Sequence, residues 1–315
     1  MRIEEIEGIT ERIAQRLKEY GIETVYDLAV CIPDELIEVV GGSRNGASYL
    51  ITQARNHLSK LEIIKREFST AKEVLEERKN LRYCTTGSRS LDILLGGGIE
   101  IKALTEVIGA YGSGKSQLCH TLAVTCQLPL EERGLEGKVI YVDTEGTFRA
   151  NRIKEIAVSR GLDPDKILEG ILYARAYNVP HLELIIRTLG AHIKENNVKM
   201  VVVDSIINPF RSEYVGRENL SERQQRLNTL INKLRNLAEF YELAIVITNQ
   251  VLASPSIIVG DSLVPAGGNV IAHGSTYRLF LRKSGKYRIA SIIDSPCHPF
   301  SETRFIITEK GITDG

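Results

Sequence analysis

The feature that most constrains this chain is the run of residues 109–116, G-A-Y-G-S-G-K-S, which matches the phosphate-binding pattern G-x-x-x-x-G-K-[ST] in full. An apolar run at 104–108 predicts a buried strand before it, and residues 117–127 predict a helix after it. Glycines let the backbone wrap around a phosphate, so that its N–H groups and the positive end of the helix face the anion. The sequence therefore predicts a nucleoside triphosphate site made of Gly109, Ala110, Tyr111, Gly112, Ser113, Gly114, Lys115, Ser116 and Gln117.

A metal ion is expected beside this loop. Lys115 would contact the β- and γ-phosphates, and the Ser116 hydroxyl would bind Mg²⁺. The apolar residues 200–203 end in a carboxylate, Asp204. The carboxyl ends of parallel strands meet at one edge of a sheet, so Asp204 would face the same Mg²⁺. A buried aspartate that only caps the next turn is the alternative, and the complete phosphate loop makes it the weaker one.

Two further strands end in polar residues that suit hydrolysis of ATP. Residues 138–143 lead into Glu145, and a carboxylate one strand away from the phosphate loop can orient and deprotonate water. We predict Glu145 as the general base and Asp143 as the weaker candidate; alternatively, both acids cap the helix that begins near residue 151. The amide of Gln250 follows the strand 244–249 and is placed to respond to the γ-phosphate. The predicted catalytic residues are Glu145, Lys115 and Gln250.

Length and composition bound the other properties. With 315 residues, of which 43% are hydrophobic, the chain can form one large domain and a small one. The formal net charge is zero, so a polyanion must bind at a local patch. Five cysteines without a C-x-x-C pair predict reduced thiols. No apolar run approaches the ~20 residues that span a bilayer, and the acidic start is unlike a signal peptide, so we expect a cytoplasmic protein without membrane contact.

Two parts are expected before residue 81. Residues 1–60 predict a small all-α domain similar to the helix-hairpin-helix type, with helices at 10–20, 24–30, 34–40 and 46–57. They hold seven Lys or Arg against ten Asp or Glu, a net charge of −3, so packing or adaptor work is favoured over DNA contact. Residues 61–80 are charged and predict a linker. An exposed Phe68, three residues before Ala71, would pack on its own chain or insert into a partner.

Residues 81–315 alternate apolar runs with helical patterns, which predicts an α/β domain with a mostly parallel sheet covered on both faces. Strands are predicted at 105–108, 138–143, 171–174, 200–204 and 244–249, and crossover helices at 152–160, 180–195 and 220–241. The strands predicted at 276–282, 287–294 and 304–308 have no helices between them and indicate an antiparallel C-terminal extension.

Two predicted loops have the composition of a nucleic-acid interface. The loop 208–219 and the start of the next helix carry Arg211, Tyr214, Arg217 and Arg223, and guanidinium groups beside an aromatic ring suit phosphates and unstacked bases. A solvated charged loop is the alternative. The loop 251–269 is long and rich in Gly, Pro and Ser, and it carries Gly267, Gly268 and Asn269. Long structureless loops in compact domains are usually functional.

Several motifs together resemble one family. They are Thr86-Gly87-Ser88-Arg89-Ser90-Leu91-Asp92, Gly96-Gly97-Gly98-Ile99-Glu100, the phosphate loop continued to His120, Asp143-Thr144-Glu145-Gly146-Thr147-Phe148-Arg149, Tyr214-Val215-Gly216-Arg217, Glu222-Arg223-Gln224-Gln225 and Gly267-Gly268-Asn269-Val270-Ile271-Ala272-His273. Over essentially the whole chain, the sequence resembles the archaeal RadA recombinases, which are of the RecA type.

The resemblance implies a RecA-like ATPase core and a protein that polymerises on single-stranded DNA and pairs it with double-stranded DNA. It implies a polymerisation motif at Phe68 and Ala71, DNA-binding loops at 208–219 and 251–269, and an adenine contact at Arg149. The segment 294–299, with Pro296, resembles a cap laid over a neighbour's nucleotide, and His273 matches a residue that links the second loop to the nucleotide interface.

The sequence departs from the family pattern at two positions. Glu218 stands where the family has glycine, and Phe300 stands where its cap carries an acid, which leaves Asp294 as a candidate ligand for K⁺. The favoured interpretation is an ATP-dependent recombinase, associated with the nucleoid and assembled as a helical filament or a ring. The alternatives are an accessory paralogue that assists another recombinase, and a hexameric RecA-fold helicase or signalling ATPase.

Overall fold

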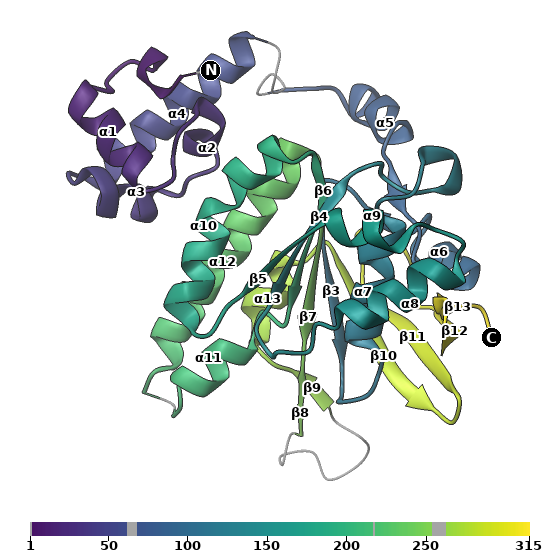
Figure 1. Cartoon of the computed structure of the whole chain (residues 1–315). Coiled ribbons are helices and arrows are strands. Elements are labelled where there is room, and N and C mark those ends of the chain that lie inside the picture. The colour runs from purple at the N-terminus through teal and green to yellow at the C-terminus, as the bar shows by residue number, and fades with distance from the viewer. Residues whose placement is uncertain (1, 62–67, 217, 254–262) are drawn as a thin grey trace. The chain divides into compact units, whose positions relative to one another are not determined.

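The computed structural model describes residues 2–61, 68–216, 218–253 and 263–315. The chain divides into two compact units, Met1–Leu81 with Leu184–Asn196, and Arg82–Glu183 with Asn197–Gly315 (Figure 1). The predicted domain limits, 1–60, 61–80 and 81–315, stay a prediction. Each unit has its own buried apolar core.

The N-terminal unit begins with a bundle of short helices. Thr10 and Ser43 accept hydrogen bonds from backbone N–H groups in the first turns of α1 (Glu11–Glu19) and α4 (Arg44–Lys60), the capping that their side chains favour at helix starts. Leu17, Leu28 and Leu58 are fully buried between the helices. The four expected helices are present, and the elements are η1 (Ile3–Glu5), α1 (Glu11–Glu19), α2 (Val25–Ala29), α3 (Pro33–Val40) and α4 (Arg44–Lys60).

The segment interpreted as a linker contains a helix, α5 (Ala71–Lys79). Thr70 accepts a hydrogen bond from the backbone N–H of Glu73, whose side chain in turn accepts from the backbone N–H of Thr70. This capping box is visible in the sequence as Thr-x-x-Glu and predicts a helix start. Every residue of α5 is exposed, so local capping rather than a core explains this helix.

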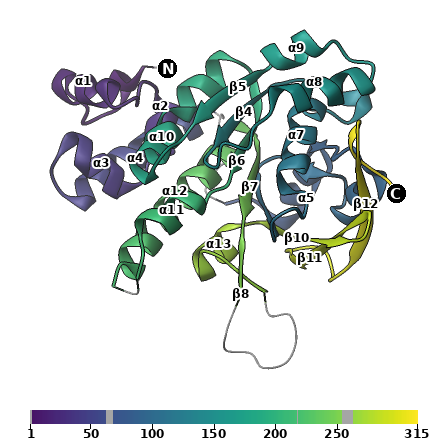
Figure 2. The same cartoon turned by 60° about the horizontal axis from the view of Figure 1, so that its bottom comes forward.

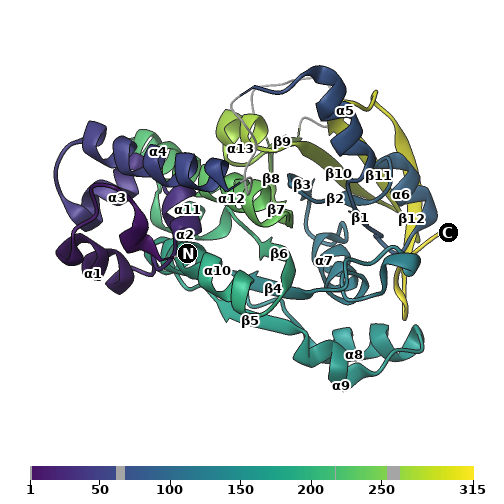
Figure 3. The same cartoon turned by 90° about the horizontal axis from the view of Figure 1, so that it is seen from above.

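The second unit is built on a nine-stranded sheet in the order β13-β12-β11-β10-β3-β7-β6-β4-β5. The strands from β10 to β5 run parallel, and β11, β12 and β13 extend the sheet antiparallel, so the predicted fold class is confirmed. Figure 3 shows this extension on the side of the sheet away from β4 and β5. The strands are β3 (Ala103–Gly109), β4 (Lys138–Asp143), β5 (Ile171–Arg175), β6 (Val198–Asp204), β7 (Ala244–Asn249), β10 (Tyr277–Ser284), β11 (Tyr287–Asp294), β12 (Glu302–Thr308) and β13 (Gly311–Thr313).

The central strands are buried on both faces, as their continuous apolar runs require. Helix α7 (Lys115–Thr125) packs against β3, β6 and β7, and α12 (Leu220–Tyr241) packs against β3 and β7. Figure 1 shows the two helices on opposite sides of the sheet. The remaining elements are β1 (Tyr83–Cys84), α6 (Arg89–Leu94), β2 (Ile99–Glu100), α7 (Lys115–Thr125), η2 (Leu130–Glu132), α8 (Ala150–Ser159), α9 (Pro164–Glu169), α10 (Val179–Glu195), α11 (Asn208–Glu213), α12 (Leu220–Tyr241), β8 (Val251–Ala253), β9 (Leu263–Pro265) and α13 (Gly268–Gly274).

Two segments predicted as loops contain short elements. The segment 208–219 begins with α11, whose Pro209 suits the first turn of a helix. The segment 251–269 contains the β8-β9 hairpin and the first residues of α13, and Figure 2 shows β8 continuing from β7. These elements are too short to leave a clear periodicity in the sequence.

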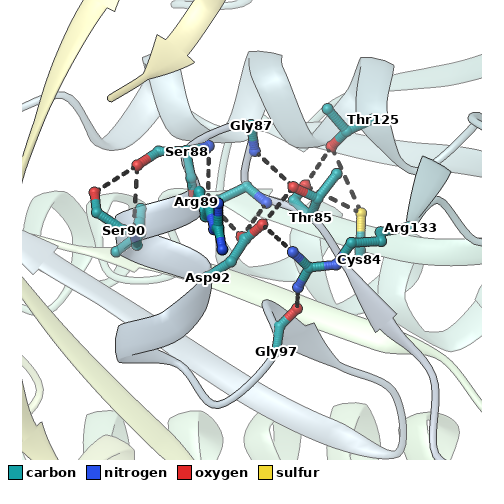
Figure 4. A network of polar contacts seen from close by, with 12 residues as sticks. Cys84, Thr85, Gly87, Ser88, Arg89, Ser90, Asp92, Gly97, Thr125 and Arg133 are labelled. Carbon is teal, nitrogen blue, oxygen red and sulfur yellow. Dashed lines mark hydrogen bonds and ion pairs between the residues drawn. The ribbon is translucent and has the colours of Figure 1, made fainter. Parts of the chain in front are cut away.

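A polar network fixes the segment that precedes the sheet (Figure 4). Asp92, only 1% exposed, accepts hydrogen bonds from the Thr85 hydroxyl and from the backbone N–H and hydroxyl of Thr86. Its carboxylate also pairs with Arg133 at 3.3 Å, and the same guanidinium donates to the carbonyl of Gly97. The network therefore ties β1, α6 and the glycine turn before β2 together. In the described part of the chain, no helix is both long and apolar enough to cross a membrane.

Candidate functional site

The four predicted site strands lie side by side, in the order β3-β7-β6-β4. The phosphate loop follows β3, Gln250 follows β7, Asp204 ends β6 and Glu145 follows β4. Asp143 and Asp204 are register partners, so the ends of β4 and β6 are level. The parallel sheet therefore brings the predicted nucleotide, metal and catalytic residues to one edge, where ligands bind in open α/β sheets.

The backbone of the phosphate loop takes conformations that favour glycine. Gly112 and Gly114 have φ values of 73° and 108°, a region that side chains with a Cβ rarely adopt. At Gly109, an added Cβ would lie 2.5 Å from the carbonyl oxygen of Leu281 on β10, a distance that atoms do not tolerate. The sequence pattern G-x-x-x-x-G-K-S therefore has a direct steric reason in this fold.

Lys115 rests on the loop itself. Its Nζ donates to the carbonyl oxygens of Gly109 at 2.8 Å and Ala110 at 3.1 Å. Burial lowers the pKa of Lys115, while the nearby carboxylates of Asp204 and Glu145 oppose that shift. A phosphate that replaced the two carbonyls would give this ammonium a charged partner.

The other loop residues differ in exposure. Ser116 and Gln117 are half-buried in the first turn of α7, and the Gln117 Oε1 accepts a hydrogen bond from Arg152 Nε at 2.9 Å. Ser113 is buried, and its Oγ has no hydrogen-bond partner among the described residues. Tyr111 is fully exposed. The Ser113 hydroxyl is therefore an unsatisfied polar group inside the loop, whereas the Tyr111 side chain is open to solvent.

Asp204 is held by hydroxyl groups. Only 2% of the residue is exposed. Its Oδ2 accepts from Tyr141 Oη at 3.0 Å, its Oδ1 accepts from the Thr248 hydroxyl, and the Thr147 hydroxyl lies 3.5 Å from Oδ2. Burial and, after it, the nearby carboxylate of Asp204 raise the pKa of Tyr141 well above its usual value, so the phenol stays protonated and donates.

Glu145 is exposed, and one of its oxygens is oriented by two side chains. Oε1 accepts a hydrogen bond from Ser205 Oγ at 2.7 Å and another from Gln250 Nε2 at 2.7 Å. The other oxygen, Oε2, accepts no hydrogen bond within the described residues. This arrangement leaves one carboxylate oxygen available to a water molecule, as a general base requires.

Asp143, the weaker candidate base, has both carboxylate oxygens engaged by hydrogen-bond donors of the protein. It accepts from the backbone N–H groups of residues 145–148, from Tyr173 Oη at 3.2 Å and from Arg175 Nη1 at 3.0 Å. The residue is completely buried. Asp143 therefore holds the turn that carries Glu145, and Glu145 is the better placed of the two acids.

Gln250 connects Glu145 to a predicted DNA-binding residue. Its Oε1 accepts a hydrogen bond from Arg211 Nη1, while its Nε2 donates to Glu145. The backbone carbonyl of Gln250 accepts from the N–H of Ala266 at 2.8 Å, and the side chain of Asn249 donates to the carbonyl of Ala266 at 2.7 Å. The two ends of the segment 250–266 are thus closed by hydrogen bonds next to the catalytic candidates.

Among the remaining predicted DNA-binding residues, Tyr214 directly follows α11, Arg223 lies on α12, and Gly267, Gly268 and Asn269 lie at the start of α13. The Tyr214 hydroxyl donates to Glu222 at 3.2 Å and accepts from Arg226, and Arg223 is half-buried. Gly267 and Gly268 have φ values of 83° and 61° at the start of α13, where Asn269 is exposed. Helix α13 packs against α12, and Figures 2 and 3 show it beside the β8-β9 hairpin. Arg217 and residues 254–262 of the loop 251–269 lie outside the described residues.

The residues that the family resemblance links to adenine or to a subunit interface lie on exposed positions. Arg149 is exposed and donates from Nη1 to the carbonyls of Gly146 and Phe148, both at 2.8 Å. Asp294, at the end of β11, and Pro296, in the loop that follows, are exposed. His273 is exposed on α13. In the N-terminal unit, Phe68 is 90% exposed and Ala71 begins α5. Their roles stay predictions.

The comparison with known families agrees with this geometry. A family model described as Rad51 matches residues 77–315, which include all the strands of the main sheet. This chain belongs to the Rad51 family. The "DNA repair and recombination protein RadA" of Cenarchaeum symbiosum (strain A) is 45% identical over 313 residues, which cover 99% of this chain and 79% of that protein. The resemblance to RadA recombinases is confirmed.

Three residues of this Rad51-family site escaped the sequence analysis: Tyr141, Ser205 and Thr248. Each lies inside or directly after an apolar run, where the sequence pattern assigns no separate role to its side chain. A tyrosine within a buried strand needs a partner for its hydroxyl, and Tyr141 stands two residues before Asp143, on the same face of β4. That signal indicates a hydroxyl directed at the carboxylate edge, although the sequence does not say which carboxylate receives it.

Proposed function

We propose that this Rad51-family chain is an ATP-dependent DNA recombinase that acts in repair. On this proposal it hydrolyses ATP, forms filaments on single-stranded DNA and promotes pairing and strand exchange with double-stranded DNA in the cytoplasm. Its family membership and its relative, named a DNA repair and recombination protein, support this class of function. The phosphate loop beside Asp204 and Glu145 supports the use of ATP.

The residues present suit ATP with Mg²⁺. The Ser116 hydroxyl and the Asp204 carboxylate are hard oxygen donors, which Mg²⁺ prefers, and Mg²⁺ is usually bound by one or two protein groups together with substrate phosphates. The described residues contain no cluster of three or more His, Cys, Asp or Glu that would hold a metal by itself, which agrees with a metal that arrives with the nucleotide. When bound, Mg²⁺ supplies positive charge to the phosphate oxygens.

In this proposal Glu145 accepts the proton of the water that attacks the γ-phosphate. Ser205 and Gln250 hold one of its oxygens, so the other can face the water. Lys115 would move from the carbonyls of Gly109 and Ala110 to the phosphates, where its charge is better compensated. Positioning and charge stabilisation of this kind account for most catalysis of phosphoryl transfer.

The observation that carries the proposal is the continuous contact from Glu145 through Gln250 to Arg211. Arg211 is exposed on α11, where it can reach a DNA phosphate. A phosphate bound by Arg211 would compete for the hydrogen bond to Gln250 and so alter the support of Glu145. This link gives a physical reason why hydrolysis would depend on DNA.

Assembly into filaments is part of the same proposal. Phe68 is a large apolar side chain that is 90% exposed beside a helix with no buried residue, so its contact is expected on another subunit. The segment 294–299, in which Asp294 and Pro296 are exposed, would cover a neighbour's nucleotide, and Asp294 would supply a ligand for K⁺ there. If ATP is held between subunits, its binding energy also stabilises the filament.

The test measures ATP hydrolysis by the full chain with and without single-stranded DNA, followed by electron microscopy of the same mixtures. We expect strong stimulation by DNA, helical filaments, and loss of turnover but retention of filaments in Glu145→Gln. Turnover at the same rate without DNA and at any protein concentration would contradict the proposal.

An accessory role is the second candidate, because Phe300 is 73% exposed where the family cap carries an acid, and Glu218 places a carboxylate beside the predicted DNA contact at 217. Strand exchange by the chain alone, scored with homologous duplex DNA, separates the two. A recombinase completes the exchange, whereas an accessory protein binds ATP and DNA but requires another recombinase.

A further inference from the structure

The side-chain hydrogen bonds to the Asp204 carboxylate come from protein hydroxyl groups. Tyr141 on β4 and Thr248 on β7 donate to its two oxygens. The Thr147 hydroxyl lies 3.5 Å from Oδ2, at the upper limit for a hydrogen bond. An ionised carboxylate has about four lone-pair positions, so room remains for a further donor. Because only 2% of the residue is exposed, these hydroxyls decide which way the carboxylate faces.

The ring of Tyr141 is fixed on both sides. His120 on α7 stacks on it with a centroid distance of 5.7 Å and an interplanar angle of 21°, and Phe148 lies at 4.9 Å. Tyr141 has no exposed surface, and His120 has 2%. A ring enclosed in this way cannot change rotamer without opening the core, so the position of its hydroxyl is set by packing.

The same stack reaches the helix that carries the other metal candidate. His120 stands four residues after Ser116 on α7, so the two side chains lie on one face of the helix, one turn apart. Tyr141 therefore contacts α7 through its ring and Asp204 through its hydroxyl. One side chain connects the two elements from which the Mg²⁺ ligands would come.

We propose that Tyr141 is a positioning residue for the metal site, and that it fixes the spacing between the Asp204 carboxylate and the Ser116 hydroxyl. The inference rests on the proposed function, because it takes these two residues as the ligands of a divalent cation that arrives with a nucleoside triphosphate. Mutating a residue that hydrogen-bonds to a metal ligand and orients it typically lowers metal affinity by about 10- to 100-fold. Tyr141 acts through Asp204 and touches neither phosphate nor metal.

The chain offers a matched control in Tyr173. Tyr173 is the register partner of Tyr141 on β5, packs on the same Phe148 at 4.8 Å, and donates its hydroxyl to Asp143 at 3.2 Å. Asp143 keeps four backbone N–H donors and the Arg175 guanidinium without it. Removing the Tyr173 hydroxyl therefore deletes a similar hydrogen bond in the same aromatic cluster without affecting Asp204.

The experiment compares the full-length chain with Tyr141→Phe and Tyr173→Phe. Binding of adenylyl imidodiphosphate, a non-hydrolysable ATP analogue, is measured by calorimetry over a series of Mg²⁺ concentrations, and thermal melting checks the fold. We expect the Mg²⁺ midpoint to rise about tenfold in Tyr141→Phe. Binding without Mg²⁺ should stay unchanged in that variant, and Tyr173→Phe should match the wild type.

The outcomes separate this inference from the proposed function. An unchanged Mg²⁺ midpoint in Tyr141→Phe, or equal shifts in the two tyrosine variants, would overturn the inference while leaving the nucleotide site intact. A wild-type chain that binds the analogue without any Mg²⁺ dependence would overturn both. If Tyr141→Phe does not fold, Thr248→Val tests the other hydroxyl on Asp204, and an unchanged midpoint there would refute control by these hydroxyls.

Discussion

The side-chain amide of Gln250 donates a hydrogen bond to Glu145 Oε1 at 2.7 Å, across the ends of β7 and β4. The other end of the same amide accepts from Arg211 on α11. If the Gln250 amide moves with one of these two partners, its hydrogen bond to the other partner must lengthen or break. The predicted base and the predicted DNA contact therefore share one rigid group, which can couple the two sites reciprocally.

Gln250→Ala should remove this coupling. We expect DNA stimulation of ATP turnover to fall by at least about tenfold, or about 1.4 kcal/mol, because Glu145 no longer senses Arg211. Turnover without DNA should change less, since Ser205 still holds Glu145. The measurement is steady-state ATP hydrolysis over a DNA titration, with Arg211→Gln as a companion that should behave alike. Full stimulation in Gln250→Ala would show that DNA acts by another route.

Lys115→Ala should weaken nucleotide binding by about 10- to 100-fold, the range expected for one hydrogen bond to a charged group. Within the described residues the ammonium donates only to backbone carbonyls, so the phosphates would be its first charged partners. Calorimetric titration with ADP measures the change. Lys154→Ala, on the exposed side of α8, should bind like the wild type. Equal affinities for all three proteins would contradict the assignment of the loop.

The sequence predicted this edge of the sheet because each element there ends in a recognisable residue. A glycine pattern marks the phosphate loop, and carboxylates at the ends of apolar runs mark Asp204 and Glu145. Parallel strands bring such ends together whatever their order along the chain. The strand order itself, with β7 between β3 and β6, required the structure.

The contacts between these residues could not be predicted. The sequence ranks Glu145 above Asp143 as the candidate base, but the contacts of the two acids are visible only in the structure, where the backbone N–H groups of residues 145–148 all donate to Asp143. The bond between Gln250 and Arg211 joins residues 39 positions apart. Such pairs depend on rotamers and loop paths, which a one-dimensional pattern does not specify.

Asp92→Asn should destabilise the second unit. The carboxylate is buried, and the Thr85 and Thr86 groups around it all donate hydrogen bonds to it. The side-chain amide of an asparagine would instead direct its own N–H groups at one of these donors (Figure 4). We expect a loss of about 3 kcal/mol in the free energy of unfolding. Arg133→Gln should cost at most about 1 kcal/mol, because its side chain is 48% exposed. Urea unfolding followed by far-ultraviolet circular dichroism measures both, and the reverse order would contradict this account.

Phe68→Ala should reduce self-association. The ring is 90% exposed, and its burial in another subunit would be worth about 2 kcal/mol or more. Size-exclusion chromatography should show elution at lower mass, more clearly at low protein concentration. Leu75→Ala, at a 57% exposed apolar residue of α5, is the matched control and should leave the elution unchanged. If both variants elute like the wild type, the Phe68 side chain is not the contact.

His120 should make the fold sensitive to acid. Both ring nitrogens lack hydrogen-bond partners among the described residues. Burial is the main reason that the pKa of His120 falls to about 4; Arg152 and Arg149 lower it further, and Asp143 opposes them. The folded protein therefore keeps this ring neutral where an unfolded chain, with an ordinary pKa of about 6.5, takes up a proton. Stability from this group is complete above about pH 6.5 and is lost as the pH falls toward 4.

The loss amounts to about 2 kcal/mol at about pH 5 by this linkage. Other groups also titrate in that range, so the informative quantity is the difference between the wild type and His120→Phe, which keeps the stack on Tyr141 without a titratable nitrogen. Between about pH 7.5 and 5, the unfolding free energy of the wild type should fall by about 2 kcal/mol more than that of the variant. Parallel pH dependence of the two proteins would mean that His120 finds a partner for its proton in the folded state.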